Sequence, residues 1–192
     1  MKPIVYKRGL AYLIDILIIS LILIIIQIYM PETKDYRDQS GLITESFIRN
    51  EIGEKQYIKQ IANLSTEMDQ ANVYYTSVSM LLIVFFFIII PKMKQKTIGQ
   101  SLVGIKIKSD HLTLKQLFIR AAVVNALLYT MIGLLLLFAV SSFVYFAILS
   151  LLGIIQFIVN IKSIFMILLN KDSKGLQDIW SNTEIIFEEE IK

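Results

Sequence analysis

The sequence predicts an all-α membrane protein with four transmembrane helices, and three observations lead to this fold class. Of its 192 residues, 55% are hydrophobic, and soluble domains of this size rarely reach a mean hydropathy of +0.63. The hydrophobic residues are clustered in long runs. Most basic residues lie beside those ends of the runs that would face the same side of a membrane. The chain outside the runs is too short for a second core, so residues 1–192 are predicted to form one domain.

The predicted spans follow from length, because a transmembrane helix needs about 20 mainly apolar residues. Four segments qualify, at residues 10–29, 73–90, 121–140 and 143–169. The first is too long for the apolar part of a signal peptide, so we interpret it as an uncleaved helix. Pro31 and Pro91 predict sharp ends for the first two, since proline disfavours helix at the preceding residue. The fourth is long for one crossing; it either tilts, or breaks near Gly153 or Asn160 and continues along the interface.

The distribution of Lys and Arg predicts the orientation, because short cytoplasmic loops are enriched in these residues. Lys2, Lys7 and Arg8 precede the first segment, and Lys171 and Lys174 follow the fourth. The loop between the second and third segments contains further lysines (Lys92, Lys94, Lys96, Lys106, Lys108 and Lys115). Residues 31–72 carry mainly acids (Glu32, Asp35, Asp38, Glu45, Glu51, Glu54, Glu67 and Asp69). Both termini are therefore predicted to be cytoplasmic, with residues 31–72 on the outer side.

Two parts outside the spans have a predicted structure of their own. In residues 31–72 the apolar side chains recur near helical spacing, which predicts one or two amphipathic helices, either a cap on the bundle or a lid or partner-binding face. In residues 105–108 isoleucine alternates with lysine, which is typical of a short strand, and residues 184–188 form a second such run flanked by acids. We expect these two runs to pair as a small cytoplasmic β-element.

Four charged residues near the predicted cytoplasmic side form the main candidate site. Arg8 and Asp15 are seven positions apart, on nearly the same helix face but about 10.5 Å apart along the axis, so they are expected to share a third group or a water-filled recess. Arg120 enters the third segment from the same side, and Asp178 follows the fourth. Two interpretations remain open. The charges fix helix packing, or Asp15 is a cation or proton site, since carboxylates within membranes often mark ion pathways.

The other polar residues in apolar context are Asn125, Gln156, Asn160 and Lys162. They are able to form hydrogen bonds between helices or to line a solute path, and Lys162 either extends to the headgroups or pairs with an acid. The chain has no cysteine and one histidine, His111, so we expect no enzyme activity, no metal site and no cofactor. The sequence contains no basic patch interleaved with aromatic residues, so we do not expect it to bind nucleic acid.

Three motifs follow one another along the chain, at residues 7–15 (KRGLAYLID), 97–107 (TIGQSLVGIKI) and 174–183 (KGLQDIWSNT). They resemble, in this order, the opening, the cytoplasmic loop and the closing motif of the RDD family of bacterial membrane proteins. The resemblance implies that Arg8, Asp15 and Asp178 are the arginine and two aspartates for which the family is named, and that the chain lies in a bacterial cytoplasmic membrane. The family often has His before its last Asp; here Gln177 occupies that position, which weakens a proton-handling role there.

The resemblance and the charges lead to two functional hypotheses. In the first, the protein transports a small cation, protons or a small solute, with Asp15 as the binding group, Arg8 and Asp178 tuning it, and Arg120 and Asn125 in support. It would act as an oligomer, because four helices enclose little pore. In the second, the protein is a non-transporting accessory that binds another membrane protein, and its charged residues are structural.

Overall fold

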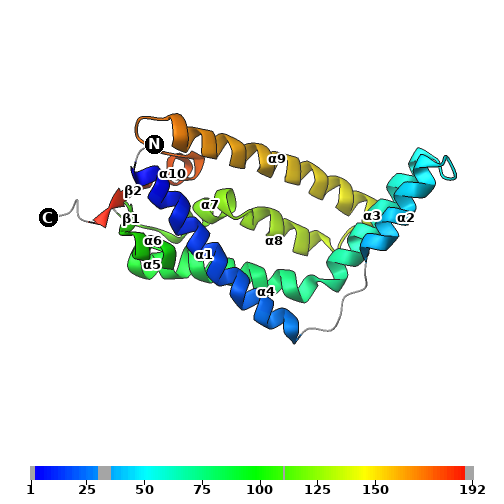
Figure 1. The fold of residues 1–192 in the computed structure, drawn as a ribbon, viewed down its shortest axis with the longest axis horizontal. Helices are drawn as coiled ribbons and strands as arrows, with labels where there is room; N and C mark the ends of the chain where they lie inside the picture. Colours follow the sequence, from blue (N-terminus) through cyan, green and yellow to red (C-terminus); the bar gives the residue numbers. More distant parts are fainter. Residues whose placement is uncertain (1–2, 30–35, 110, 189–192) are drawn as a thin grey trace.

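The computed structural model describes residues 3–29, 36–109 and 111–188, which are mostly helical (Figure 1). Three helical stretches are long and apolar enough to span a membrane, namely Pro3–Ile28, Val73–Lys94 and Ser142–Leu169, and a bent pair could supply a fourth. Lys2, Glu32 and Asp35, which contribute to the predicted charge pattern, and Pro31, which was predicted to end the first span, lie outside the described residues.

The first span is helix α1 (Pro3–Ile28), which begins seven residues before the predicted apolar segment. A proline is well tolerated in the first turn of a helix, where its missing N–H would have no partner. Arg8 and Asp15 therefore lie on one continuous helix. The helix ends close to the predicted boundary.

The second span does not end before Pro91, so that prediction is wrong. Helix α4 (Val73–Val84) passes into a π-helix, η1 (Phe85–Ile89), and then into α5 (Ile90–Lys94), which ends at a left-handed residue, Gln95. A π turn widens the helix by one residue, and such turns accommodate a local disruption of the hydrogen-bond ladder. The wide turn directly before Pro91 allows the helix to continue past it.

The third predicted span, residues 121–140, is not one straight helix. It consists of α7 (Leu114–Val124) and α8 (Leu127–Leu136), whose axes differ by 84°. At the break, Ala126 adopts a left-handed backbone conformation with φ 52°. By contrast, α9 (Ser142–Leu169) is one unbroken helix of 28 residues, which excludes a break at Gly153 or Asn160.

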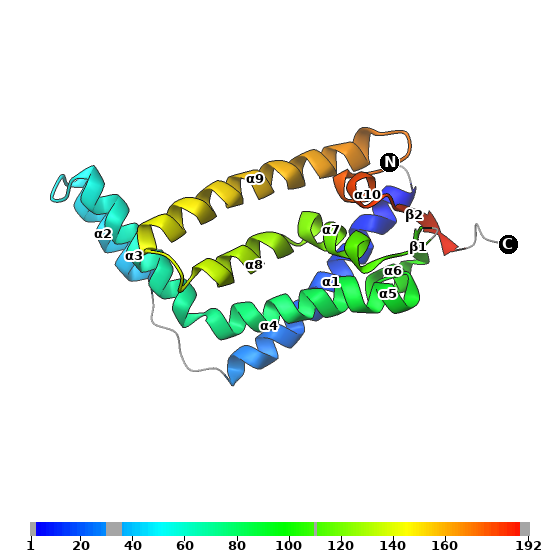
Figure 2. The same ribbon diagram turned by 180° about the vertical axis from the view of Figure 1, so that it is seen from behind.

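Helices α2 (Tyr36–Ile48) and α3 (Glu54–Ala71) project from the end of the molecule opposite to the two strands, as Figures 1 and 2 show from both sides. Two helices are thus present where one or two were predicted. They pack on each other through stacked rings of Phe47 and Tyr57, and the Tyr145 hydroxyl of α9 donates a hydrogen bond of 2.8 Å to Asp69 of α3. This bond ties the projecting pair to the long helix.

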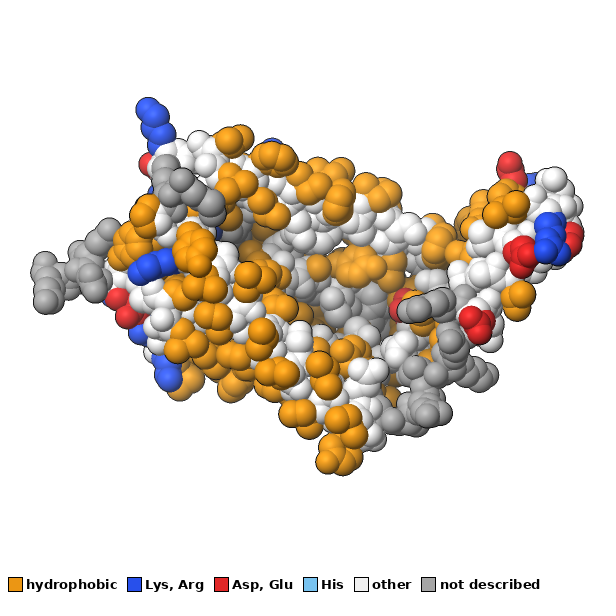
Figure 3. Space-filling model, in the orientation of Figure 1, with side chains coloured by type: hydrophobic (Ala, Val, Ile, Leu, Met, Phe, Trp, Pro, Cys, Tyr) orange, Lys and Arg blue, Asp and Glu red, His pale blue; other side chains and the backbone are white. Residues whose placement is uncertain are grey.

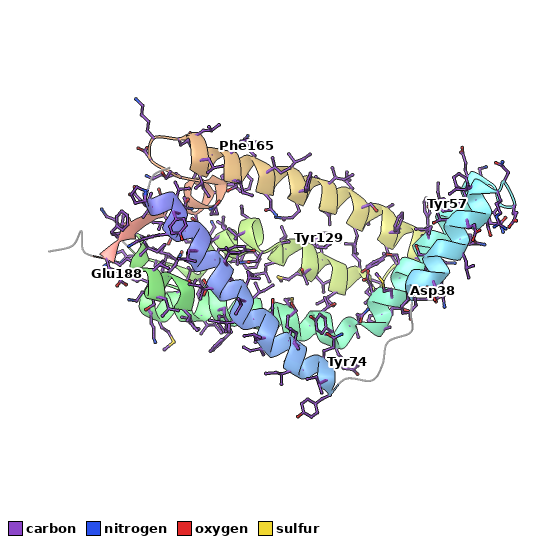
Figure 4. All side chains as sticks on the ribbon, viewed as in Figure 1. Asp38, Tyr57, Tyr74, Tyr129, Phe165 and Glu188 are labelled. Atoms are coloured by element: carbon purple, nitrogen blue, oxygen red, sulfur yellow. The ribbon has the colours of Figure 1, made fainter. Side chains whose placement is uncertain are left out.

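The predicted pairing of residues 105–108 with residues 184–188 is confirmed. Strands β1 (Ile105–Lys108) and β2 (Glu184–Phe187) form an antiparallel sheet in which Lys108 faces Glu184. Lys96 makes an ion pair with Glu188, which Figure 4 labels at this end of the molecule. Ile105, Ile107 and Ile185 point into the main hydrophobic core, together with residues of α1, η1 and α7.

The long helices expose most of their apolar side chains. Only 22%, 11% and 11% of the residues in the apolar windows of the three long stretches are buried, and orange hydrophobic side chains cover much of the face in Figure 3. Exposed apolar surface on this scale is unsuited to water and suited to lipid. Two short helices, α6 (Ile98–Val103) and α10 (Leu176–Ser181), lie near the sheet and position the candidate site.

Candidate functional site

Three of the four predicted charged residues form one buried ion cluster. The Asp178 carboxylate accepts a hydrogen bond of 2.6 Å from Arg8 Nη2 through one oxygen and another of 2.6 Å from Arg120 Nη1 through the other. Both arginine side chains are 11% exposed, and the Asp178 side chain is fully buried. Charge-assisted bonds of this length, shielded from water, hold α1, α7 and α10 together.

Backbone and hydroxyl groups complete this cluster. Arg8 Nη1 donates to the Ser173 carbonyl oxygen at 2.7 Å, and Arg120 Nη1 donates to Thr183 Oγ1 at 2.5 Å. The Gly175 N–H donates to Asp178 at 2.9 Å. Burial alone raises the pKa of Asp178, but the charges of Arg120 and Arg8 and the bond from Gly175 outweigh it, so the pKa lies below its ordinary value.

Asp15 takes no part in that cluster and shares no hydrogen-bond partner with Arg8 among the described residues, although both line one cavity. Its carboxylate accepts hydrogen bonds from the Thr97 hydroxyl at 2.5 Å and from the Gly99 N–H at 2.7 Å. These donors belong to the N-cap and first turn of α6, where unpaired N–H groups and the helix dipole favour a negative charge. Asp15 is 1% exposed and holds α6 against α1.

The remaining predicted polar residues have separate positions. Gln156 Nε2 donates to the Val123 carbonyl oxygen at 2.8 Å and to Asn160 Oδ1 at 2.9 Å, so it satisfies a carbonyl freed by the break between α7 and α8. Asn125 lies at that break, and neither polar atom of its buried amide has a partner among the described residues. Lys162 is exposed on α9.

A cavity of about 450 Å³ brings several of these residues together. Five predicted site residues line it, namely Arg8, Asp15, Arg120, Asn125 and Asn160, whereas Asp178, Gln156 and Lys162 do not. Its walls come mainly from α1, α7 and α9, and Figure 3 shows the surface hollowed between α1 and α9. Its volume is within the range of about 300–1,000 Å³ that small-molecule sites occupy.

Several residues of the site were not predicted from the sequence. Thr97 and Gly99 bind Asp15, Ser173 and Thr183 bind the arginines, and Ser163 bonds to Gln177 beside the cavity. A signal for the first pair is present, because Thr97 and Gln100 have the spacing of a capping box and form one in the structure. No local pattern indicates the others, since their partners are distant in the sequence.

The residues that line the cavity are suited to binding a ligand. The polar groups of the cavity are guanidinium, carboxylate, amide and hydroxyl groups in a mainly apolar lining. Among the described residues, no group of three or more His, Cys, Asp or Glu side chains is placed to hold a metal ion. Such a lining suits a ligand that has both a polar part and an apolar part.

Comparison with protein families gives one informative result. The model of the RDD family matches residues 3–182, nearly the whole chain. No curated protein and no solved structure matches the chain. The match includes the first two motifs and the third as far as residue 182, with Arg8, Asp15 and Asp178 inside it.

Proposed function

Since the chain belongs to the RDD family of membrane proteins, we propose that it transports a small solute across the membrane and binds that solute in the cavity between α1, α7 and α9. The observation that carries this proposal is the convergence of Arg8, Asp15, Arg120, Asn125 and Asn160 on one cavity between apolar helices. Ionisable residues among membrane helices are costly, and they commonly line substrate or ion pathways. One chain encloses little pore, so the transporter acts as an oligomer.

Exchange of small cations for protons is the narrower form of this proposal. It assigns the exchanged ion to Asp15, with Arg8, Arg120 and Asp178 setting the local charge. The support is the position of Asp15 on the cavity wall. Its two oxygens already accept bonds from Thr97 and Gly99, so exchange requires α6 to release the carboxylate.

The proposed orientation places both termini in the bacterial cytoplasm and α2 and α3 outside. Its support is the excess of lysines around α5 and β1 and the acids of α2 and α3. The chain has no cysteine, so a single introduced thiol gives a clean label. In intact cells, a membrane-impermeant maleimide should label Gln39→Cys on α2 and leave Lys94→Cys on α5 unlabelled until the cells are opened. The reverse pattern would refute this orientation.

Transport is tested by internal pH in proteoliposomes after pulses of sodium, potassium or lithium. The pair of variants is Asp15→Asn, which removes the buried charge, and Asp38→Asn, which removes an exposed charge on α2. A cation-dependent pH change that only Asp15→Asn abolishes would support exchange at Asp15. Absence of any change with folded wild-type protein would refute cation exchange.

A non-transporting accessory protein is the second candidate, and one observation favours it. Asp178 and Asp15 each bind partners within the chain, as charges that only stabilise a fold would. This candidate expects Asp15→Asn to lower the yield of folded protein. It also expects a membrane-protein partner to copurify after crosslinking in cells. Purification of a folded, uncrosslinked protein alone would count against it.

A further inference from the structure

We propose that the cavity binds an anionic phospholipid from the surrounding bilayer, with the headgroup at Arg8 and Arg120 and an acyl chain along the apolar wall. This inference rests on the proposed role of the cavity as a binding site, and it goes beyond the proposed function by naming a bilayer lipid as a ligand in addition to the transported solute. Three independent features support it: the local charge, the open side of the cavity and an unpartnered amide.

The charge is unbalanced at one end of the cavity. Arg8 and Arg120 share a single carboxylate, that of Asp178, which leaves one positive charge in excess there. Asp15 also lines the cavity, but it lies about 10.5 Å further along α1 and makes no ion pair with either arginine, since its carboxylate accepts its hydrogen bonds from α6. Within the described part of the chain, Arg120 makes its hydrogen bonds through Nη1 alone, so the donors on Nη2 and Nε remain available to a phosphate.

The position of the arginines suits a headgroup. Both pair with Asp178 of α10, and α10 lies at the same end of the molecule as β1 and β2 (Figures 1 and 2). Arg8 is in the second turn of α1. A bilayer places its phosphates at the ends of spanning helices and its acyl chains along their middle. The lining of the cavity is mainly apolar, with Phe87, Val124 and Ile164 among its residues.

The cavity has an open side toward lipid. Helix α1 packs mainly on α6 and α4, whereas α9 packs mainly on α3 and α8, so these two walls of the cavity are supported by different neighbours. Figure 3 shows the hollow between them on an otherwise apolar face. A lipid could enter there from the side without crossing an aqueous phase.

Asn125 supplies the third feature. Its amide is buried at the cavity wall, and both its oxygen and its nitrogen have no partner among the described residues. A buried amide without a hydrogen bond is costly and calls for an explanation. The ester and phosphate oxygens of a lipid are acceptors that its N–H₂ could bind.

The test measures contact between a lipid and the cavity by fluorescence quenching. Trp180 is the only tryptophan, so Trp180→Phe provides a dark background. Phe87→Trp then places a reporter in the cavity, and Phe165→Trp places a control on the outer side of α9, where Figure 4 labels Phe165 and where it is 58% exposed. Each is reconstituted in vesicles that contain either phosphatidylglycerol or phosphatidylcholine with brominated acyl chains.

Brominated phosphatidylglycerol should quench the Phe87→Trp reporter about fivefold more effectively than brominated phosphatidylcholine, the preference that one uncompensated basic side chain confers. The Phe165→Trp control should be quenched equally by both lipids. Equal quenching in the cavity would overturn the proposal. Tyr12→Trp, on the α1 wall of the cavity, replaces the first reporter if Phe87→Trp does not fold.

Two further arms identify the ligand and the site. Asn125→Leu fills part of the cavity and removes the amide, so it should lower the quenching of the cavity reporter by phosphatidylglycerol, and unchanged quenching would place the lipid elsewhere and refute the proposal. Inorganic phosphate should leave the quenching unchanged, and relief of quenching by phosphate would mean that the site binds a free anion instead. Neither arm measures flux, so a negative result here leaves the transport experiment to decide the proposed function.

Discussion

Gly99 lies so close to Ala11 that a Cβ atom added at Gly99 would be 2.1 Å from the Ala11 carbonyl oxygen. Backbone meets backbone at this point, so no side-chain rotation could relieve the contact. The close approach is what brings the Gly99 N–H within 2.7 Å of Asp15. Gly99 in the first turn of α6 and Asp15 in α1 thus act together to hold the short helix against the long one.

Gly99→Ala should destabilise the protein by about 1–3 kcal/mol, the usual cost of forcing an extra carbon into a packed site. It should also lengthen the bond to Asp15. Thermal unfolding in detergent measures the effect. Gly41→Ala is the matched control, since a Cβ at that position in α2 meets nothing within 4 Å, and its unfolding temperature should not fall. Equal unfolding temperatures for the two variants would contradict the close packing of α6 on α1.

Asp178→Asn should cost about 3–5 kcal/mol, because it leaves two buried guanidinium groups without a counter-charge. The double variant Arg8→Gln with Asp178→Asn should recover part of this loss, since one of the uncompensated charges is then absent. Urea unfolding of the single and double variants gives both values. Glu45→Gln, which breaks the exposed pair with Arg49, is the control and should have little effect. Full additivity of the two cluster substitutions would show that Arg8 and Asp178 do not interact.

The stability of the protein should fall in acid through Asp178. The pKa of this carboxyl lies below its ordinary value of 3.8 in the folded state, so the folded protein holds the proton less tightly than the unfolded chain. The stabilisation is therefore complete above the unfolded pKa and is lost as the pH falls through the folded pKa. Unfolding temperatures recorded from neutral pH downward should show this loss in the wild type and a flatter curve in Asp178→Asn. Parallel curves would exclude Asp178 as the source.

Gln156→Leu should destabilise the protein by about 1–3 kcal/mol, because it leaves the Val123 carbonyl oxygen at the break between α7 and α8 without its donor. Thermal unfolding is again the measurement. Lys162→Leu makes a similar change in polarity on the exposed side of the same helix and should leave the unfolding temperature nearly unchanged. A larger effect at Lys162 than at Gln156 would mean that the break is stabilised in another way.

Features with a local pattern were predictable from the sequence. The apolar runs indicated the long helices because length and composition are sufficient for that inference, and the alternation of Ile105 and Ile107 with lysines indicated β1. The break at Asn125 was not predictable from such patterns, since neither glycine nor proline marks it and Ala126 rarely adopts a left-handed conformation.

In the candidate site, too, some contacts were predictable from the sequence and others were not. Arg8, Arg120 and Asp178 were grouped correctly, because opposite charges in an apolar setting must find one another. Asp15 lines a cavity together with Arg8 but does not share a hydrogen-bond partner with it. Its partners are a hydroxyl and a backbone N–H more than 80 residues away, and no charge in the sequence reveals them. The capping box at Thr97 predicts the start of a helix but not the carboxylate that binds there.

The position of Asp178 also has a consequence for biogenesis. It neutralises Arg8 and Arg120, yet it follows Arg8 by 170 residues and Arg120 by 58. A ribosome therefore delivers both arginines before the acid that pairs with them. Until β2 and α10 dock, the nascent chain carries two unmatched cations at the membrane surface, where anionic lipid headgroups are the nearest counter-ions. We therefore expect the site to close late in synthesis, when the Asp178 carboxylate replaces those headgroups as the partner of the two arginines.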